Sequence, residues 1–229
     1  MLLAIDTATR VPSLALYDGE RVLAEETWRS ANNHTVELAP GLVRMLGRQN
    51  VPPSALKGIA VALGPGSFTG LRIGLGVAKG LALTLAIPLM GIPTLDALVY
   101  AQARQRGPVC AVLQAGRGRV SAAFYRRRGG RWQRQGDYRL TTLDELCADI
   151  ETRTFFCGEI DAQAAELLRE RLGAQAVVAS PASSLRRAGY LAELGWRRLE
   201  RGEMDDPATL APIYLRHPPI KVPALSPSK

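Results

Sequence analysis

The chain is poor in the residues that build metal sites, disulfide frameworks and imidazole catalysis. Among its 229 residues there are three cysteines and two histidines. Cys110, Cys147 and Cys157 are odd in number and show no C-x-x-C spacing. This pattern argues against a disulfide framework and a zinc site, and it favours a reducing compartment.

Long uncharged apolar runs are also missing. The most apolar window, residues 73–93, contains Lys79 and Pro88, which argues against a membrane span. Asp6 interrupts the apolar N-terminal run before it reaches the length of a signal peptide. We therefore expect a cytoplasmic protein that makes no membrane contact.

The composition that remains is typical of a folded domain with a basic balance. The chain is 47% hydrophobic and 22% charged, and 29 basic against 21 acidic residues give a formal charge of +8. Wholesale disorder is therefore not expected, and the length allows one large domain or two compact lobes. The positive charge favours a polyanion such as RNA nearby but does not locate a binding face.

The order of apolar patterns predicts two α/β lobes. Three strands are expected within residues 2–28, then a helix over 34–49 that contains Pro40, a buried strand over 56–63 and a helix over 70–85. After Gly107 a hairpin and a third strand are expected, then a strand over 152–158 and helices over 161–172 and 183–201. We expect an N-terminal lobe at 1–106, a smaller lobe at 107–217 and a disordered tail at 218–229.

The glycine-rich segment "GPGSFTGLRIGLGVAKG" follows a strand and begins a helix. It matches neither the Walker A loop nor the Rossmann turn, because the required residues fall at the wrong spacing. A strand, a permissive loop and a helix N-terminus still make an anion site feasible, with Gly64, Gly66 and Ser67 as weak candidates. The alternative is a turn without a ligand, capped by Ser67 or Thr69.

The helix after this loop carries glycines on its outer face. At 100° per residue, one face is apolar and should lie on the sheet: Gly74, Val77, Ala78, Leu81 and Leu85. The opposite face holds Arg72, Gly76, Lys79, Gly80 and Leu83. An exposed mid-helix glycine costs about 1 kcal/mol relative to alanine, so two of them indicate a partner helix that approaches closely; drift under weak selection is the alternative.

Four stretches together carry a family resemblance: "LLAIDTAT", "NNHTVELAP", the glycine segment through "KGLAL", and "PIYLR". The chain resembles the TsaB (YeaZ) family of bacterial tRNA threonylcarbamoyladenosine biosynthesis subunits, densely over residues 2–98 and thinly beyond. The resemblance implies an α/β, two-lobed actin-like fold (ASKHA, ribonuclease H-like), with mixed sheets flanked by helices and a reduced second lobe.

The resemblance also implies partners. It makes the chain a non-catalytic scaffold that pairs through its first two helices with TsaD, the subunit that transfers threonylcarbamoyl to the adenosine next to the tRNA anticodon. A homodimer through the same surface, the TsaE ATPase, and tRNA bound by the complex are further implied partners. No cofactor is required of this chain, although ATP or ADP could bind at the joint interface. The interface candidates are His34, Leu38, Leu42, Arg72, Gly76, Lys79, Gly80 and Leu83.

Catalysis by the isolated chain is not expected. TsaD holds its metal with two histidines four residues apart, whereas Leu38 stands four residues after His34. His34 is therefore expected to be a helix-start or interface residue rather than a metal ligand. Asp6 corresponds to the first-lobe acid of actin-like ATPases, but Gln114 and Arg119 stand where the family pattern has acids, which argues against a Mg²⁺–nucleotide site. Asp6 then bonds to its own turn. The rival hypothesis is a stand-alone small-molecule kinase or glycoprotease-like peptidase.

A basic hairpin in the second lobe is a candidate RNA surface. The candidate contacts are Arg126, Arg127, Arg128, Arg131 and Trp132. Arginine can meet phosphate and tryptophan can stack on a base. A solvated hairpin with a half-buried tryptophan has the same composition, and the sequence does not separate the two.

Overall fold

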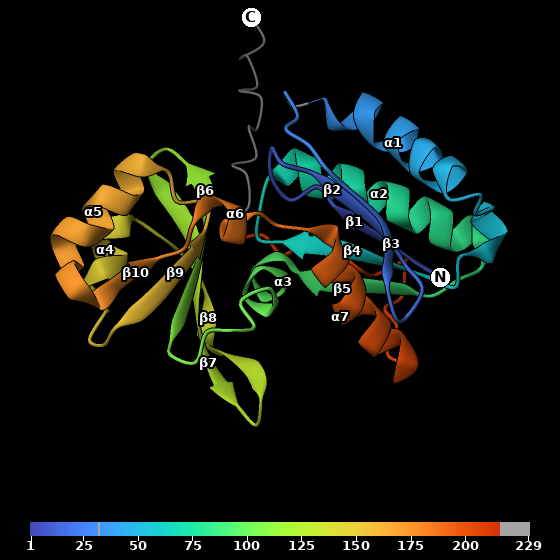
Figure 1. Ribbon diagram of the computed structural model, residues 1–229. Helices are drawn as coiled ribbons and strands as arrows, with labels where there is room; N and C mark the ends of the chain where they lie inside the picture. The colour runs from blue at the N-terminus through green and yellow to red at the C-terminus, as the bar shows by residue number, and fades with distance from the viewer. Residues whose placement is uncertain (32, 216–229) are drawn as a thin grey trace, which may run out of the picture.

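Two five-stranded mixed sheets form the frame of the protein (Figure 1). The computed structural model describes residues 1–31 and 33–215. The strand orders are β3-β2-β1-β4-β5 and β10-β9-β6-β7-β8. In each sheet an antiparallel meander of three strands is extended by parallel strands on one side. The described residues therefore contain the same design twice, as expected for a two-lobed α/β fold.

The elements have the following bounds. The first sheet consists of β1 (Leu2–Asp6), β2 (Ser13–Tyr17), β3 (Val22–Thr27), β4 (Gly58–Gly64) and β5 (Leu89–Pro93). The second consists of β6 (Val109–Gly116), β7 (Arg119–Arg128), β8 (Arg131–Thr141), β9 (Thr154–Gly158) and β10 (Ala176–Val178). The α-helices are α1 (His34–Arg48), α2 (Phe68–Leu85), α3 (Thr94–Tyr100), α4 (Leu143–Ala148), α5 (Ala162–Leu172), α6 (Pro181–Ser184) and α7 (Ala188–Glu200). Two 3₁₀ turns are η1 (Pro53–Ala55) and η2 (Gly173–Gln175).

The first sheet is covered on both faces, so β1 and β4 are buried along their whole lengths. Successive side chains of a strand point to opposite faces. Leu3 and Ile5 pack under α1 and α2, whereas Leu2 and Ala4 pack against α7. This is why the strands read as continuous apolar runs rather than as an alternation.

The second sheet is also a two-sided layer. Ala123 and Tyr125 of β7 pack toward α3. On the other face, Val120 and Ala122 pack with residues of α4 and α5. Helix α3 therefore lies between the sheets, because Ala97 contributes to the core of the first and Leu98 to that of the second.

Helix α7 returns to the first sheet, which corrects the expected lobe of residues 107–217. Leu191 and Ala192 are buried in the core under β1 and β4. Without α7, the face of the first sheet opposite α1 and α2 would be exposed to solvent. A helix remote in sequence can cover it with apolar side chains. The expected helix over 183–201 is in fact α6 and α7, and strand β10 was not expected. The expected disordered tail at 218–229 lies outside the described residues.

Helix α2 is the one helix among the described residues that is long and apolar enough to cross a membrane, judged by length and composition alone. In the structure its Leu75, Ala78 and Ala82 are buried in the core on the first sheet. A core helix of a folded domain meets the same criterion.

Candidate functional site

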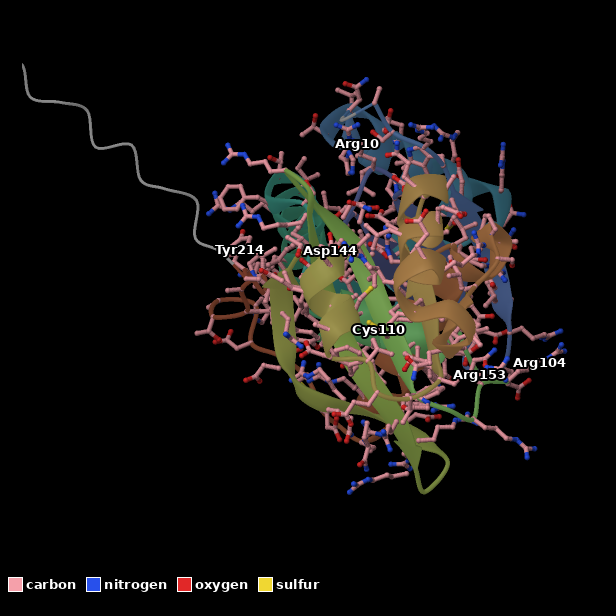
Figure 2. All side chains as sticks on the ribbon, turned by 90° about the vertical axis from the view of Figure 1, so that its left-hand side faces the viewer. Arg10, Arg104, Cys110, Asp144, Arg153 and Tyr214 are labelled. Carbon is pink, nitrogen blue, oxygen red and sulfur yellow. The ribbon has the colours of Figure 1, made fainter. Side chains whose placement is uncertain are left out.

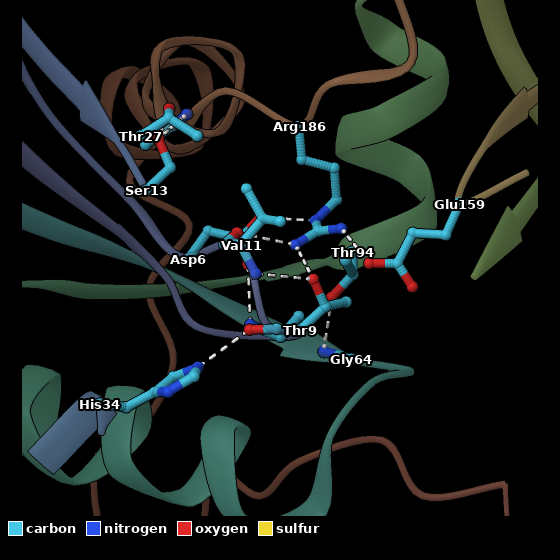
Figure 3. A network of polar contacts seen from close by, with 12 residues as sticks. Asp6, Thr9, Val11, Ser13, Thr27, His34, Gly64, Thr94, Glu159 and Arg186 are labelled. Atoms are coloured by element: carbon cyan, nitrogen blue, oxygen red, sulfur yellow. Dashed lines mark hydrogen bonds and ion pairs between the residues drawn. The ribbon is translucent and has the colours of Figure 1, made fainter. Parts of the chain in front are cut away.

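Asp6 ends β1 and is buried at the junction of the two sheets (Figure 3). Its Oδ1 accepts a hydrogen bond from the backbone N–H of Ala8 at 2.9 Å. This confirms the expected bond of Asp6 to its own turn. Its Oδ2 accepts a second bond, at 3.1 Å, from Nε of Arg186. Sequence reasoning missed this partner because nothing local links two residues so far apart.

Arg186 lies between α6 and α7, and its side chain is only 5% exposed. Besides Asp6, the guanidinium donates to Oγ1 of Thr9 at 2.6 Å and to the carbonyl of Val11 at 3.1 Å. It also reaches Oε1 of Glu159 at 3.4 Å. Burial alone would lower the pKa of Arg186, but the charges of Asp6 and Glu159 raise it above its ordinary value.

Glu159 is a carboxylate of the second lobe that lies beside Gln114. It follows β9, and its Oε2 accepts the backbone N–H of Gln114 at 3.0 Å. Thus Gln114 does stand at this site, but a carboxylate from a neighbouring strand lies beside it. Two acids from the two sheets therefore flank one internal cation (Figure 3). In the described arrangement the guanidinium holds the place between them.

His34 begins α1 and is buried, which contradicts its assignment to a partner interface. Its Nε2 lies 2.9 Å from the carbonyl oxygen of Thr9. A carbonyl only accepts, so Nε2 carries the proton. Nδ1 then accepts from the hydroxyl of Ser30 at 3.2 Å. The imidazole thus ties the start of α1 to the turn after β1, and it is a helix-start residue.

The loop of Gly64, Gly66 and Ser67 brings the first turn of α2 against the turn after β1. Ser67 is the N-cap, and its Oγ accepts the backbone N–H of Gly70 at 3.2 Å. The backbone N–H of Ser67 donates to the carbonyl of Ala8 at 2.6 Å. A Cβ at Gly66 would overlap that same carbonyl group.

Two glycines within α2 also allow this close approach to the turn after β1. A Cβ at Gly70 would overlap the carbonyl oxygen of Thr7, and one at Gly74 would overlap its Oγ1. Gly64 adopts a φ of +104°, a region that favours glycine. Close packing within the chain therefore accounts for the first part of the glycine segment, and no anion is needed to explain it.

The outer glycines of α2 are different. Gly76 and Gly80 are exposed, and a Cβ at either position would meet nothing within 4 Å. Leu83 is 68% exposed, Arg72 is exposed and Lys79 is half-buried. This strip faces outward, as the helical spacing predicts. The sheet-facing side is rotated from the expected one: Leu75 and Ala82 are buried, and the expected Val77, Leu81 and Leu85 are only half-buried.

On α1, two of the expected interface residues lie inside the protein. Leu38 is 1% and Leu42 is 7% exposed, so their assignment to a partner interface is wrong. The outward stripe consists of Val36, at 67%, and Val43, at 68%, with the exposed Ala39 and Pro40 between them. The sequence does indicate an outward apolar stripe, because α1 has more apolar residues than one face can hold. The prediction placed Leu38 and Leu42 in that stripe, whereas the structure places Val36 and Val43 there.

Helices α1 and α2 contact each other on the same side of the first sheet (Figure 1). We call their outward surface the α1–α2 face: Val36, Ala39, Pro40, Val43, Gly76, Gly80 and Leu83. Six large hydrophobic side chains are exposed among the described residues, and three of them belong to this face. An apolar surface of this kind is a candidate protein interface.

Groups suited to holding a metal ion are not assembled in the described part of the chain. No cluster of three or more His, Cys, Asp and Glu side chains occurs there. The three cysteines are free and buried, Cys110 within the second sheet (Figure 2). Burial raises the pKa of Cys157 to about 12, so its thiol stays protonated and unreactive near neutral pH.

Comparison with known proteins agrees with this architecture. A family model described as "TsaD: tRNA N6-adenosine threonylcarbamoyltransferase" matches residues 21–216. The "tRNA threonylcarbamoyladenosine biosynthesis protein TsaB" of Bacillus subtilis is 30% identical over 218 residues, which cover 94% of this chain and 93% of that protein.

Solved structures give the same result. YeaZ from Pseudomonas aeruginosa superposes with a TM-score of 0.78 at 28% identity, over 93% of this chain and 99% of the other. The ROK hexokinase of Thermus thermophilus, with a TM-score of 0.52 at 10% identity over 88% of this chain and 99% of that one, shares the fold alone. The fold is thus α/β and actin-like, as expected. The chain belongs to the TsaB (YeaZ) family.

Proposed function

We propose that the chain acts in tRNA N6-threonylcarbamoyladenosine biosynthesis as a non-catalytic scaffold subunit. It pairs with TsaD through the α1–α2 face, so that TsaD can transfer threonylcarbamoyl to the adenosine next to the anticodon. The role in this pathway follows from membership of the TsaB family. The pairing and the lack of catalysis are supported by two features of the structure.

The main support for this pairing is a pair of exposed glycines on α2, Gly76 and Gly80, which we call the bare strip. Inside the chain nothing requires Gly76 or Gly80, because a Cβ at either would meet open space. Each glycine weakens the helix by about 1 kcal/mol relative to alanine. A helix backbone of a partner, which packs most closely over glycine, gives these positions a use. Val36, Val43 and Leu83 beside them supply apolar contact area.

The ion pair of Asp6 with Arg186 supports a non-catalytic chain. In an actin-like ATPase the acids at the lobe junction serve a metal–nucleotide complex. Here Asp6 and Glu159 both bond to Arg186, and a guanidinium cannot be deprotonated to free them. The chain's own cation thereby takes the position between the two acids, where Mg²⁺–ATP would need them free.

The remaining partners follow from the same surface. In isolation the α1–α2 face would pair with a second copy, and TsaD would displace that copy in the complex. TsaE and ATP or ADP would then act at the joint interface, with no cofactor held by this chain alone. The tRNA would be bound by the assembled complex.

The pairing is tested by filling the bare strip. Gly76→Leu/Gly80→Leu should abolish co-elution with TsaD on size exclusion and leave the unfolding temperature unchanged or higher. Gly107→Leu is the control, because Gly107 is also exposed and a Cβ there would meet nothing within 4 Å, but it lies outside α2. Normal co-elution of the double variant would refute the proposed interface.

A further inference from the structure

A groove of about 970 Å³ lies on the other side of the first sheet from the α1–α2 face. It is lined by the β7–β8 hairpin, by α3 and by α7. Figure 1 shows this hairpin extending beyond the second sheet, near α3. Because the groove and the α1–α2 face are on opposite sides, both can be occupied at once.

Arginines without ion-pair partners line both walls of this hairpin groove. Arg127, Arg131 and Arg134 come from the hairpin, and Arg197 comes from α7. None of these four forms an ion pair within the described part of the chain. Their charge is therefore available to a ligand.

Aromatic rings hold several of these guanidinium groups in place. The guanidinium carbon of Arg127 lies 5.2 Å from the ring centroid of Trp132, and that of Arg197 lies 5.0 Å from the centroid of Tyr100. Stacking uses the flat face of a guanidinium and leaves its in-plane N–H donors free for phosphate oxygens. The indole Nε1 of Trp132 is covered and has no acceptor among the described residues.

The carboxylates of the groove accept from neutral ring donors rather than from these four arginines: Asp96 and Glu193 from phenol hydroxyls, and Glu200 from the indole N–H of Trp196. Asp96 accepts from the hydroxyls of Tyr125, at 2.6 Å, and Tyr138, at 3.0 Å. Glu193 accepts from the hydroxyl of Tyr100. These bonds fix the rings and leave the arginines unpaired. An acidic peptide would use the charge alone, whereas RNA would use both the arginine forks and the rings.

We propose that the hairpin groove binds an RNA strand. Its phosphates would bond to Arg127, Arg131, Arg134 and Arg197, and its bases would stack on the ring–guanidinium pairs. The identity of this RNA as a tRNA rests on the proposed function.

The structure divides the arginine cluster of the hairpin into two sets. Arg127 is paired with Trp132 on the groove face, together with Tyr125. Arg126 and Arg128 alternate to the opposite face, and neither of them lines the groove. Two variants that remove the same charge from the same hairpin can therefore be compared. Arg131 is the register partner of Arg128 at the end of the hairpin, but it does line the groove, so it is left unchanged in both variants.

The experiment measures the fluorescence anisotropy of a fluorescein-labelled, unmodified tRNA transcript at several salt concentrations. Arg127→Ser/Arg134→Ser should raise the Kd by roughly ten-fold and lower the slope of log Kd against log salt by about 1–2. Arg126→Ser/Arg128→Ser should change the Kd by less than about two-fold. Arg197→Ser, on the other wall, should weaken binding without any change to the hairpin, which guards against misfolding of the first variant.

Three results would overturn the inference: no tRNA binding by the full-length protein or its TsaD complex, equal weakening by both hairpin double variants, or equal displacement of the tRNA by polyglutamate at matched charge. Co-elution with TsaD is measured on the same samples. If pairing fails while the groove variants still lose RNA affinity, the proposed function is wrong and the groove stands. If pairing is normal and the groove variants bind RNA normally, only the groove is wrong.

Discussion

Nε of Arg186 donates to Oδ2 of Asp6 across 3.1 Å, although the two residues are 180 positions apart in the chain. Both side chains are 5% exposed. The pair links the end of β1 to the segment that leads into α7, and through Glu159 it also reaches the second sheet. One side chain therefore joins three parts of the chain that the sequence leaves unconnected.

Arg186→Met should destabilise the fold by about 3–5 kcal/mol, because Asp6 would be left buried without its cation. Adding Asp6→Asn should recover part of this loss, since the unpaired charge is removed. Urea denaturation gives the free energy of unfolding. Arg187→Met is the neighbouring control: Arg187 bonds to Glu25 but its side chain is half exposed, so about 0–1 kcal/mol is expected. Equal losses of unfolding free energy for Arg186→Met and Arg187→Met would show that the buried ion pair stabilises the fold no more than the exposed one.

The isolated chain should not bind Mg²⁺–ATP. Because Arg186 bonds both Asp6 and Glu159, neither acid is free to receive the metal. Isothermal titration calorimetry with Mg²⁺–ATP should give only heats of dilution. A micromolar Kd, or turnover by the purified chain, would favour the stand-alone enzyme over the scaffold.

Glycine-to-alanine changes along α2 should divide by position. Gly70→Ala and Gly74→Ala should each destabilise by about 1–3 kcal/mol, because the added methyl overlaps Thr7. Gly76→Ala and Gly80→Ala should each stabilise the isolated chain by about 0.4–1 kcal/mol, because the methyl meets open space and the unfolded state loses freedom. Thermal unfolding of the four variants is the measurement. A uniform effect would mean that α2 does not pack as described.

Alkaline pH should weaken the fold through Tyr100. Burial, and then the hydrogen bond and charge of Glu193, raise the pKa of Tyr100 from 10.0 to about 12. A phenol whose pKa is raised by folding contributes stability that is complete below about pH 10 and is lost between about pH 10 and 12. Urea denaturation at a series of pH values should show a smaller loss over this window for Tyr100→Phe. Identical pH profiles would place Tyr100 in solvent.

Local patterns in the sequence determined much of the secondary structure. Thr142 and Glu145 are three positions apart, a spacing that predicts a capping box at the start of a helix, and both of its hydrogen bonds are present at the start of α4. The spacing of Gly76 and Gly80 correctly placed them on the outside of α2. These features depend on residues three or four positions apart, whose geometry a helix sets without reference to the rest of the chain.

Only the tertiary structure decided which faces meet and which distant charges pair. Helix α1 has apolar residues on all of its sides, so its periodicity allowed either Leu38 or Val36 to face outward. Packing on the first sheet buried Leu38 and left Val36 exposed. The sequence likewise did not predict that α7 packs on the first sheet, or that Arg186 forms ion pairs with Asp6 and Glu159. A sequence specifies local geometry at each step, but long-range pairing depends on the free energy of the whole arrangement. No short window of residues contains that sum.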